Sequence, residues 1–221
     1  MISVDKYKTF VFDCDGVVLN SNRVKTLAFY QAALPYGEKA AQALVDYHTA
    51  NGGVSRYKKF SFFLQELVPA YSDLKAGPAF DELLASYASE VYQGLLECEM
   101  APGLLQLREQ TADSRWLVVS GGDQCELRDV FARRNLRSFF DGGIYGSPDT
   151  KDQILARELA RGNIRFPAIF LGDSKYDQEA AIRAGLEFIF LSDWTEVKDW
   201  EDWAVRLDVS CLRSVKDLIR T

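Results

Sequence analysis

The chain has 221 residues, of which 48% are hydrophobic and 26% are charged, and these values exclude a disordered or fibrous protein. That length is enough for one substantial core, with or without a modest inserted domain, and folding needs no disulfide or metal ion. The formal net charge of −6 argues against a nucleic-acid partner, because nucleic acids are bound by clustered lysine and arginine side chains.

The start of the sequence, its apolar runs and the spacing of its cysteines favour a cytoplasmic location. The first residues lead directly into an apolar run without the regions of a signal peptide, and no apolar run reaches the ~18 residues of a membrane span. The four cysteines have neither CxxC spacing nor histidine partners at zinc spacing; they are Cys14, Cys98, Cys125 and Cys211. We therefore expect reduced cysteines and no membrane association.

Four short apolar runs, rich in β-branched and aromatic residues, have the character of buried strands that open into loops. They are residues 7–12, 116–120, 168–171 and 188–191. Helical periodicity occurs between them, at residues 104–110, 126–134, 153–161 and 178–184. This alternation predicts an α/β fold with a parallel sheet, in which ligands bind at the carboxyl ends of the strands.

Residues 22–98 contain no strand-like run and have the character of several helices broken at proline and glycine. We interpret this segment as a helical domain inserted after the first strand. The predicted division is a core of residues 1–20 and 99–221 and a helical cap of residues 21–98. The cap would lie above the strand ends and act as a lid.

Asp13 and Asp15 follow the first strand two residues apart, so both side chains can face the crevice. One carboxylate can attack a phosphorus atom, while the other protonates the leaving oxygen and later deprotonates the hydrolytic water. The second role requires a raised pKa for Asp15, which a neighbouring carboxylate and partial burial would supply. A charged turn is the alternative for an isolated Asp-x-Asp-Gly.

The end of the second strand and a later helix start offer donors for a phosphate. Ser120 and Gly121 provide a hydroxyl and an open backbone N–H, although Ser-Gly-Gly is also an ordinary turn. Lys151 precedes a helix, where it could pair with Asp13 and phosphate oxygens; a surface lysine is the alternative.

Asp173 and Asp177 bring two more carboxylates to the crevice. Several carboxylates beside a phosphate need a cation, and hard oxygen ligands favour Mg²⁺ over zinc. Helix capping by Asp173 or Ser174 is compatible with this role.

The ordered motifs resemble the haloacid dehalogenase-like (HAD) superfamily of phosphohydrolases over nearly the whole chain. The resemblance rests on a strand followed by Asp13-Cys14-Asp15-Gly16, a strand followed by Ser120, then Lys151, and then Gly172-Asp173-Ser174-x-x-Asp177. It implies a Rossmann-like, three-layer core with an inserted α-helical cap, and an aspartyl-phosphate intermediate on Asp13. It also implies Mg²⁺ bound by Asp13, the backbone carbonyl of Asp15 and Asp173, with Asp177 at the ion or beside its ligands. The dehalogenase branch lacks the second aspartate, so Asp15 points to phosphoryl transfer.

The cap loop at residues 51–56 resembles the substrate-recognition loop of β-phosphoglucomutase-type caps, in which an arginine holds a second phosphate. Arg56 is therefore a candidate substrate contact, because its guanidinium fork suits phosphate or carboxylate. An exposed arginine at a helix start, capped by Ser55, is the alternative. Lys25 replaces a histidine of the mutases and Gly172 replaces an acidic metal ligand, and both departures argue against mutase activity.

The sequence thus predicts a Mg²⁺-dependent phosphatase of a small phosphorylated metabolite, with a sugar phosphate as one candidate. A sugar-phosphate mutase and a catalytically silent binding protein are alternatives, and the oligomeric state is left open. Phosphonoacetaldehyde hydrolysis would need a cap lysine of depressed pKa, for which Lys25, Lys58 and Lys59 qualify by residue type alone. The sole histidine, His48, is expected to be a packed or solvated helix residue, and the tryptophan-rich residues 194–203 are expected to pack a C-terminal helix onto the core.

Overall fold

The computed structural model describes residues 3–72, 74 and 76–219, and its core is a parallel sheet. The six strands have the order β3-β2-β1-β4-β5-β6, and each neighbouring pair is parallel. The strands are β1 (Thr9–Phe12), β2 (Arg115–Asp123), β3 (Gly143–Ser147), β4 (Ala168–Gly172), β5 (Glu187–Leu191) and β6 (Cys211–Leu212). The predicted α/β class is confirmed.

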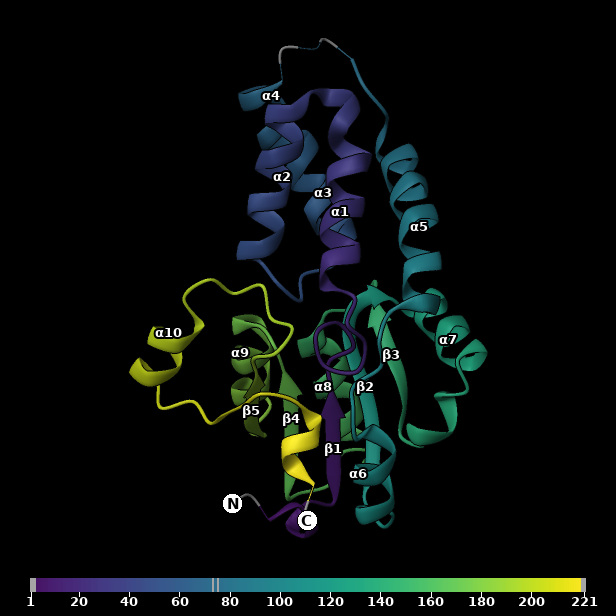
Figure 1. The fold of residues 1–221 in the computed structure, drawn as a ribbon, viewed down its shortest axis with the longest axis vertical. Helices are drawn as coiled ribbons and strands as arrows, with labels where there is room; N and C mark the ends of the chain where they lie inside the picture. Colours follow the sequence, from purple (N-terminus) through teal and green to yellow (C-terminus); the bar gives the residue numbers. More distant parts are fainter. Residues whose placement is uncertain (1–2, 73, 75, 220–221) are drawn as a thin grey trace.

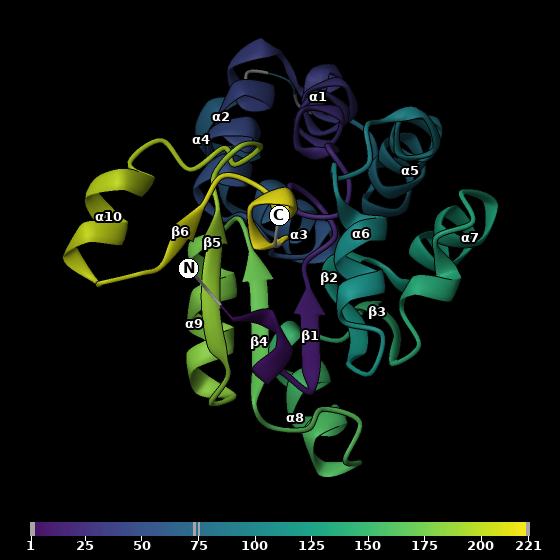
Figure 2. The same cartoon turned by 60° about the horizontal axis from the view of Figure 1, so that its bottom comes forward.

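Helices cover both faces of this sheet, which makes three layers (Figure 2). Side chains alternate along β1, so Phe10 and Phe12 pack on one face with residues of α6 and α7, while Val11 packs on the other with residues of α8 and α9. Every residue of β1 and β4 is buried, as expected of strands covered on both sides. These core helices are α6 (Leu104–Gln110), α7 (Gln124–Arg133), α8 (Lys151–Ala160) and α9 (Lys175–Arg183).

Residues 22–97, between β1 and β2, form a helical layer above the carboxyl ends of the strands (Figure 1). We call residues 22–97 the cap; the predicted domain boundaries themselves stay a prediction. Its helices are α1 (Asn22–Ala33), α2 (Glu38–Ala50), α3 (Arg56–Phe62), α4 (Val68–Tyr71) and α5 (Phe80–Glu97), with a π-helical stretch at Phe63–Leu67. Phe29 lies at the centre of the cap, with its ring centroid 5.1 Å from Phe60 and 4.3 Å from Tyr87. The chain enters and leaves the cap side by side, because Leu19 and Met100 form an antiparallel bridge.

Two strands of the sheet were not expected from the sequence. Strand β3 has the sequence Gly-Ile-Tyr-Gly-Ser, whose two glycines break the apolar run, and β6 has only two residues. Strand β2 also continues through Gly121 and Gly122 to Asp123, where a turn was expected. Backbone pairing with a neighbouring strand, which a local pattern does not reveal, decides all three cases.

The C-terminal aromatic residues pack onto the core, as expected. Helix α10 (Trp200–Arg206) buries Trp203 against Phe190, with ring centroids 5.3 Å apart. No helix among the described residues is long and apolar enough to cross a membrane. The four cysteines are free.

Candidate active site

Three buried carboxylates meet at the carboxyl ends of β1 and β4. Asp13 follows β1, Asp173 follows β4, and Asp177 lies in the first turn of α9. One oxygen from each lies within 4.8 Å of the others. The strand register explains this meeting, because Phe12 pairs with Leu171 and the two strands therefore end at the same level.

The close approach of the loop after β1 to Asp173 depends on Gly16. This residue has a φ of +74°, and a Cβ atom placed on it would lie 2.0 Å from Asp173 Oδ2. Only glycine meets both conditions at low cost, since other residues disfavour positive φ and carry a side chain. The glycine of the Asp-x-Asp-Gly motif thus lets the two aspartate-bearing loops pack together.

Asp177 is both the partner of Ser174 in the capping box of α9 and a member of the carboxylate cluster. Its Oδ2 accepts hydrogen bonds from the backbone N–H of Ser174 at 3.1 Å and from the Ser174 hydroxyl at 2.6 Å. Its Oδ1 faces Lys151. Of the two caps predicted for this segment, Ser174 is the one that forms, and its capping box uses one oxygen of Asp177 while the other faces Lys151.

Lys151 supplies the positive charge of the cluster. Helix α8 begins at this residue because the Thr150 side chain caps it, and only 1% of Lys151 is exposed. Its Nζ lies 2.9 Å from Asp13 Oδ1 and also contacts Asp177 Oδ1. Burial alone would lower the pKa of Lys151, but the two carboxylates outweigh burial and raise it.

The cluster has more negative than positive charge. Burial raises the pKa of Asp13 to about 7, with Asp177 and Asp15 adding to the effect and Lys151 opposing it. Burial and the Asp13 charge likewise raise the pKa of Asp173 well above its usual range. When all three carboxylates are ionised, the one ammonium leaves an excess of two negative charges, which a divalent cation would balance. The all-oxygen donor set suits Mg²⁺.

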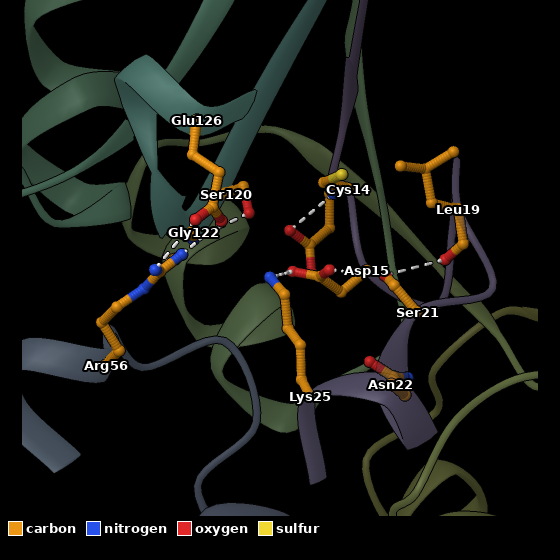
Figure 3. Close-up of polar contacts among 12 residues, drawn as sticks. Cys14, Asp15, Leu19, Ser21, Asn22, Lys25, Arg56, Ser120, Gly122 and Glu126 are labelled. Carbon is orange, nitrogen blue, oxygen red and sulfur yellow. Dashed lines mark hydrogen bonds and ion pairs between the residues drawn. The ribbon is translucent and has the colours of Figure 1, made fainter. Parts of the chain in front are cut away.

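Asp15 has a different environment, and the expectation that its pKa is raised is wrong for this arrangement. It accepts hydrogen bonds of 2.6 Å from both Lys25 Nζ and the Ser21 hydroxyl (Figure 3). Burial raises the pKa of Asp15, but the Lys25 charge and these hydrogen bonds outweigh burial and lower it. Lys25, which stands where mutases carry histidine, is thus the ion-pair partner of Asp15. Sequence reasoning noted the replacement and missed the pairing.

Ser120 and Gly121 lie at the end of β2 beneath the cap. The Ser120 side chain is fully buried and accepts a hydrogen bond of 3.0 Å from the N–H of Gly122 (Figure 3). A Cβ on Gly121 would lie 2.2 Å from the carbonyl oxygen of Gly53, so the absence of a side chain lets the cap loop approach. The Ser147 hydroxyl, which the sequence did not single out, donates to the Gly121 and Gly122 carbonyls at 3.0 Å each. Its strand, β3, was itself unpredicted.

Asn22 is a second site residue that sequence reasoning missed. Its Nδ2 donates to Asp173 Oδ2 at 2.6 Å and to the carbonyl of Trp194 at 2.8 Å. A cap-side amide therefore fixes the orientation of a core carboxylate. The only signal in the sequence is its position shortly after the first aspartate motif.

Arg56 is buried and already paired, whereas the alternative interpretation expected an exposed residue. Its guanidinium bonds both oxygens of Glu126 on α7, at 3.0 and 2.5 Å (Figure 3). It also lies 4.7 Å from the Tyr87 ring centroid. Tyr57 adds a hydrogen bond of 2.8 Å to Asp123. Arg56 therefore joins the cap to the core in this conformation, and its predicted contact with substrate stays a prediction.

A cavity of about 50 Å³ lies between the cap and the strand ends. The core side of its wall includes Asp13, Asp15 and Asp173. The cap side includes His48 and Lys59; of the two, only Lys59 was named from the sequence as a candidate for the site, as a cap lysine by residue type. The two layers therefore form the wall of this cavity jointly.

The model of the haloacid dehalogenase-like hydrolases matches residues 7–185, and the chain belongs to this family. The expected resemblance and the enzyme class, a hydrolase, are thereby confirmed. No curated protein sequence matches the chain.

Solved structures confirm the fold over nearly the whole chain. A predicted phosphoglycolate phosphatase from Lactobacillus plantarum is 20% identical, with a TM-score of 0.71 over 96% of this chain and 98% of that chain. A predicted haloacid dehalogenase-like hydrolase from Bacteroides fragilis is 18% identical, with a TM-score of 0.70 over 97% of this chain and 100% of that chain. A predicted β-phosphoglucomutase from Thermotoga maritima is 18% identical, with a TM-score of 0.62 over 96% of each chain. At these identities the similarity shows the fold, and the substrate must be argued from the site.

Proposed function

We propose that the protein is a Mg²⁺-dependent phosphatase that hydrolyses a small phosphorylated metabolite through an aspartyl-phosphate on Asp13. The observation that carries the proposal is the buried cluster of Asp13, Asp173, Asp177 and Lys151 below the cavity. Its carboxylate excess suits a divalent cation, and bound Mg²⁺ would neutralise charge and orient the phosphoryl group for attack. This function agrees with the hydrolase family of the chain.

Asp13 is oriented for nucleophilic attack by two donors on one of its oxygens. Its Oδ1 accepts a hydrogen bond of 2.7 Å from the N–H of Cys14 and lies 2.9 Å from Lys151 Nζ. The other oxygen, Oδ2, is then available to attack phosphorus as the bond to the leaving oxygen breaks. Water next attacks the acyl phosphate and releases inorganic phosphate, which regenerates Asp13.

Asp15 is the proton carrier in this proposal. Its lowered pKa keeps it ionised in this conformation, which suits the second half-reaction, in which it takes a proton from the attacking water. In the first half-reaction Asp15 must instead give a proton to the leaving oxygen. The ion pair with Lys25 opposes this protonation, because it raises the pKa of Lys25 and lowers that of Asp15, so the bound substrate must weaken the pair before Asp15 can act as the acid.

Turnover of p-nitrophenyl phosphate with and without Mg²⁺ tests the proposal. We expect Asp13→Asn to lower the Mg²⁺-dependent rate by a factor on the order of 10³ or more, because the amide cannot act as the nucleophile. The matched control is Asp113→Asn, which changes an exposed carboxylate and should leave the rate unchanged. Wild-type turnover by Asp13→Asn would contradict the assignment.

The mutase and the silent binding protein receive less support from the structure. Mutases carry an acidic metal ligand where this chain has Gly172, and a Cβ at Gly172 would lie 2.4 Å from the Cβ of Asp177. A silent binding protein does not require a buried set of catalytic side chains, whose charges are costly to bury. The cytoplasmic location and the lack of a nucleic-acid partner stay predictions.

A further inference from the structure

Lys59 and His48 form a buried pair in the cap beside the reaction cavity. Lys59 belongs to α3 and is 1% exposed, and His48 belongs to α2 and is 9% exposed. Lys59 Nζ lies 2.6 Å from His48 Nδ1. Both residues line the same cavity as Asp13 and Asp15, so a group of the substrate beyond its phosphate can reach them.

Lys59 differs from the other cations of this cavity because it lacks a counter-charge. Lys25 pairs with Asp15, and Arg56 pairs with Glu126. Among the described residues, no carboxylate lies within ion-pair distance of Lys59, whose polar contacts are the ring and the carbonyl of His48. Burial lowers the pKa of Lys59 to about 7; Lys25 adds to the effect, and Asp15 and Glu196 oppose it. An anion beside Lys59 would restore its charge.

His48 presents an unused hydrogen-bond donor. An ammonium that donates to Nδ1 leaves the ring proton on Nε2, because a neutral imidazole carries one proton. Burial, with the charges of Lys59 and Lys25, holds the pKa of His48 well below its usual range, so the ring is neutral. Nε2 is buried and has no hydrogen-bond partner in the described part of the chain. The Glu196 carboxylate, 3.9 Å away, instead accepts hydrogen bonds from the Thr26 hydroxyl.

We propose that Lys59 and His48 bind a carboxylate of the substrate, which makes the substrate a small phosphorylated carboxylic acid. This inference rests on the proposed phosphatase function and names its substrate class. One ammonium without a counter-ion and one N–H without an acceptor are the two donors that a carboxylate requires.

Calorimetric binding to the Asp13→Asn protein with Mg²⁺ tests the subsite without turnover. The two probes are 2-phosphoglycolate and 2-hydroxyethyl phosphate, which have the same length and differ in the carboxylate. Adding Lys59→Gln or His48→Gln should raise the Kd for 2-phosphoglycolate by about 10-fold or more, as for a lost charged hydrogen bond. The Kd for 2-hydroxyethyl phosphate should change much less. Lys58→Gln, which alters the neighbouring exposed lysine, is the control and should change neither Kd.

Several results would overturn the inference. Equal loss of affinity for both probes would mean that Lys59 acts only through the structure of the cap. If Lys59→Gln weakened the binding of a hexose bisphosphate more than that of 2-phosphoglycolate, the subsite would be assigned to a second phosphate. A third result would be that borohydride and a phosphonate aldehyde together inactivate the wild type but not Lys59→Arg. Lys59 would then be an amine that condenses with the aldehyde and releases water.

The controls separate this inference from the proposed function. Thermal unfolding checks the fold of each variant, and Lys59→Arg keeps the charge if Lys59→Gln does not fold. If wild-type protein hydrolyses p-nitrophenyl phosphate with Mg²⁺ but shows no carboxylate preference, only the subsite is wrong. If no phosphate ester is hydrolysed, the proposed function fails, while the binding measurement still decides the role of Lys59.

Discussion

The raised pKa of Asp13 predicts that the metal-free protein loses stability as the pH rises from about 4 to 7. The pKa moves from 3.8 to about 7 on folding, so between these values the folded state binds more protons than the unfolded state. Stability from such a group is complete below the unfolded pKa and is lost as the pH rises towards the folded pKa. At about 1.4 kcal/mol per pH unit, Asp13 alone would cost the free energy of unfolding about 4 kcal/mol by pH 7.

Urea unfolding in EDTA at several pH values measures this effect as a difference between variants. Other groups titrate in the same range, so the quantity of interest is the stability of Asp13→Asn minus that of wild type. We expect this difference to grow by about 3 kcal/mol between pH 4 and pH 7, because asparagine does not titrate and part of the total effect is already lost at pH 4. The control is Asp113→Asn, which replaces an exposed carboxylate. Its stability minus that of wild type should stay constant within about 0.5 kcal/mol over the same pH range.

Mg²⁺ provides the second arm of this experiment. A cation that binds ionised Asp13 stabilises the folded wild type in proportion to its occupancy, so millimolar Mg²⁺ should reduce the difference at pH 7. A difference between Asp13→Asn and wild type that is independent of pH in EDTA would refute the reasoning about the charge cluster. A difference that Mg²⁺ leaves unchanged would refute the cation site.

Three further substitutions test other parts of the structure. Gly172→Glu, which restores the mutase-type acid, should abolish phosphatase turnover, because its Cβ would lie 2.4 Å from Asp177 Cβ; an active variant would show that the strand end can relax. Arg56→Met should raise KM for p-nitrophenyl phosphate several-fold, because it removes the buried ion pair with Glu126 that holds the cap on the core, and Glu126→Gln should have the same effect. An unchanged KM in both variants would mean that this ion pair does not contribute to closure of the cap. Trp203→Ala should lower the free energy of unfolding in urea by about 3–5 kcal/mol, since Trp203 is 4% exposed, and a loss below 1 kcal/mol would contradict its core role.

The sequence by itself determined the fold class and the members of the carboxylate cluster. Buried parallel strands are local apolar runs, so β1 and β4 were recognisable without knowledge of their neighbours. Parallel strands also end at a common edge, so Asp13 and Asp173 could be expected to meet before any distance was known. The long connection without strand character likewise identified the helices of the cap.

Only the tertiary structure decided how the charges of the site are paired. Lys25 lowers the pKa of Asp15, and Glu126 binds Arg56, because the cap brings these side chains within 2.6 and 2.5 Å of their partners. The pKa of a buried group depends on the distance and sign of each neighbouring charge and on its loss of water. Sequence spacing contains none of these quantities once the partners belong to different layers. For the same reason the pair of His48 and Lys59, from two cap helices, became visible as a candidate subsite only in the folded protein.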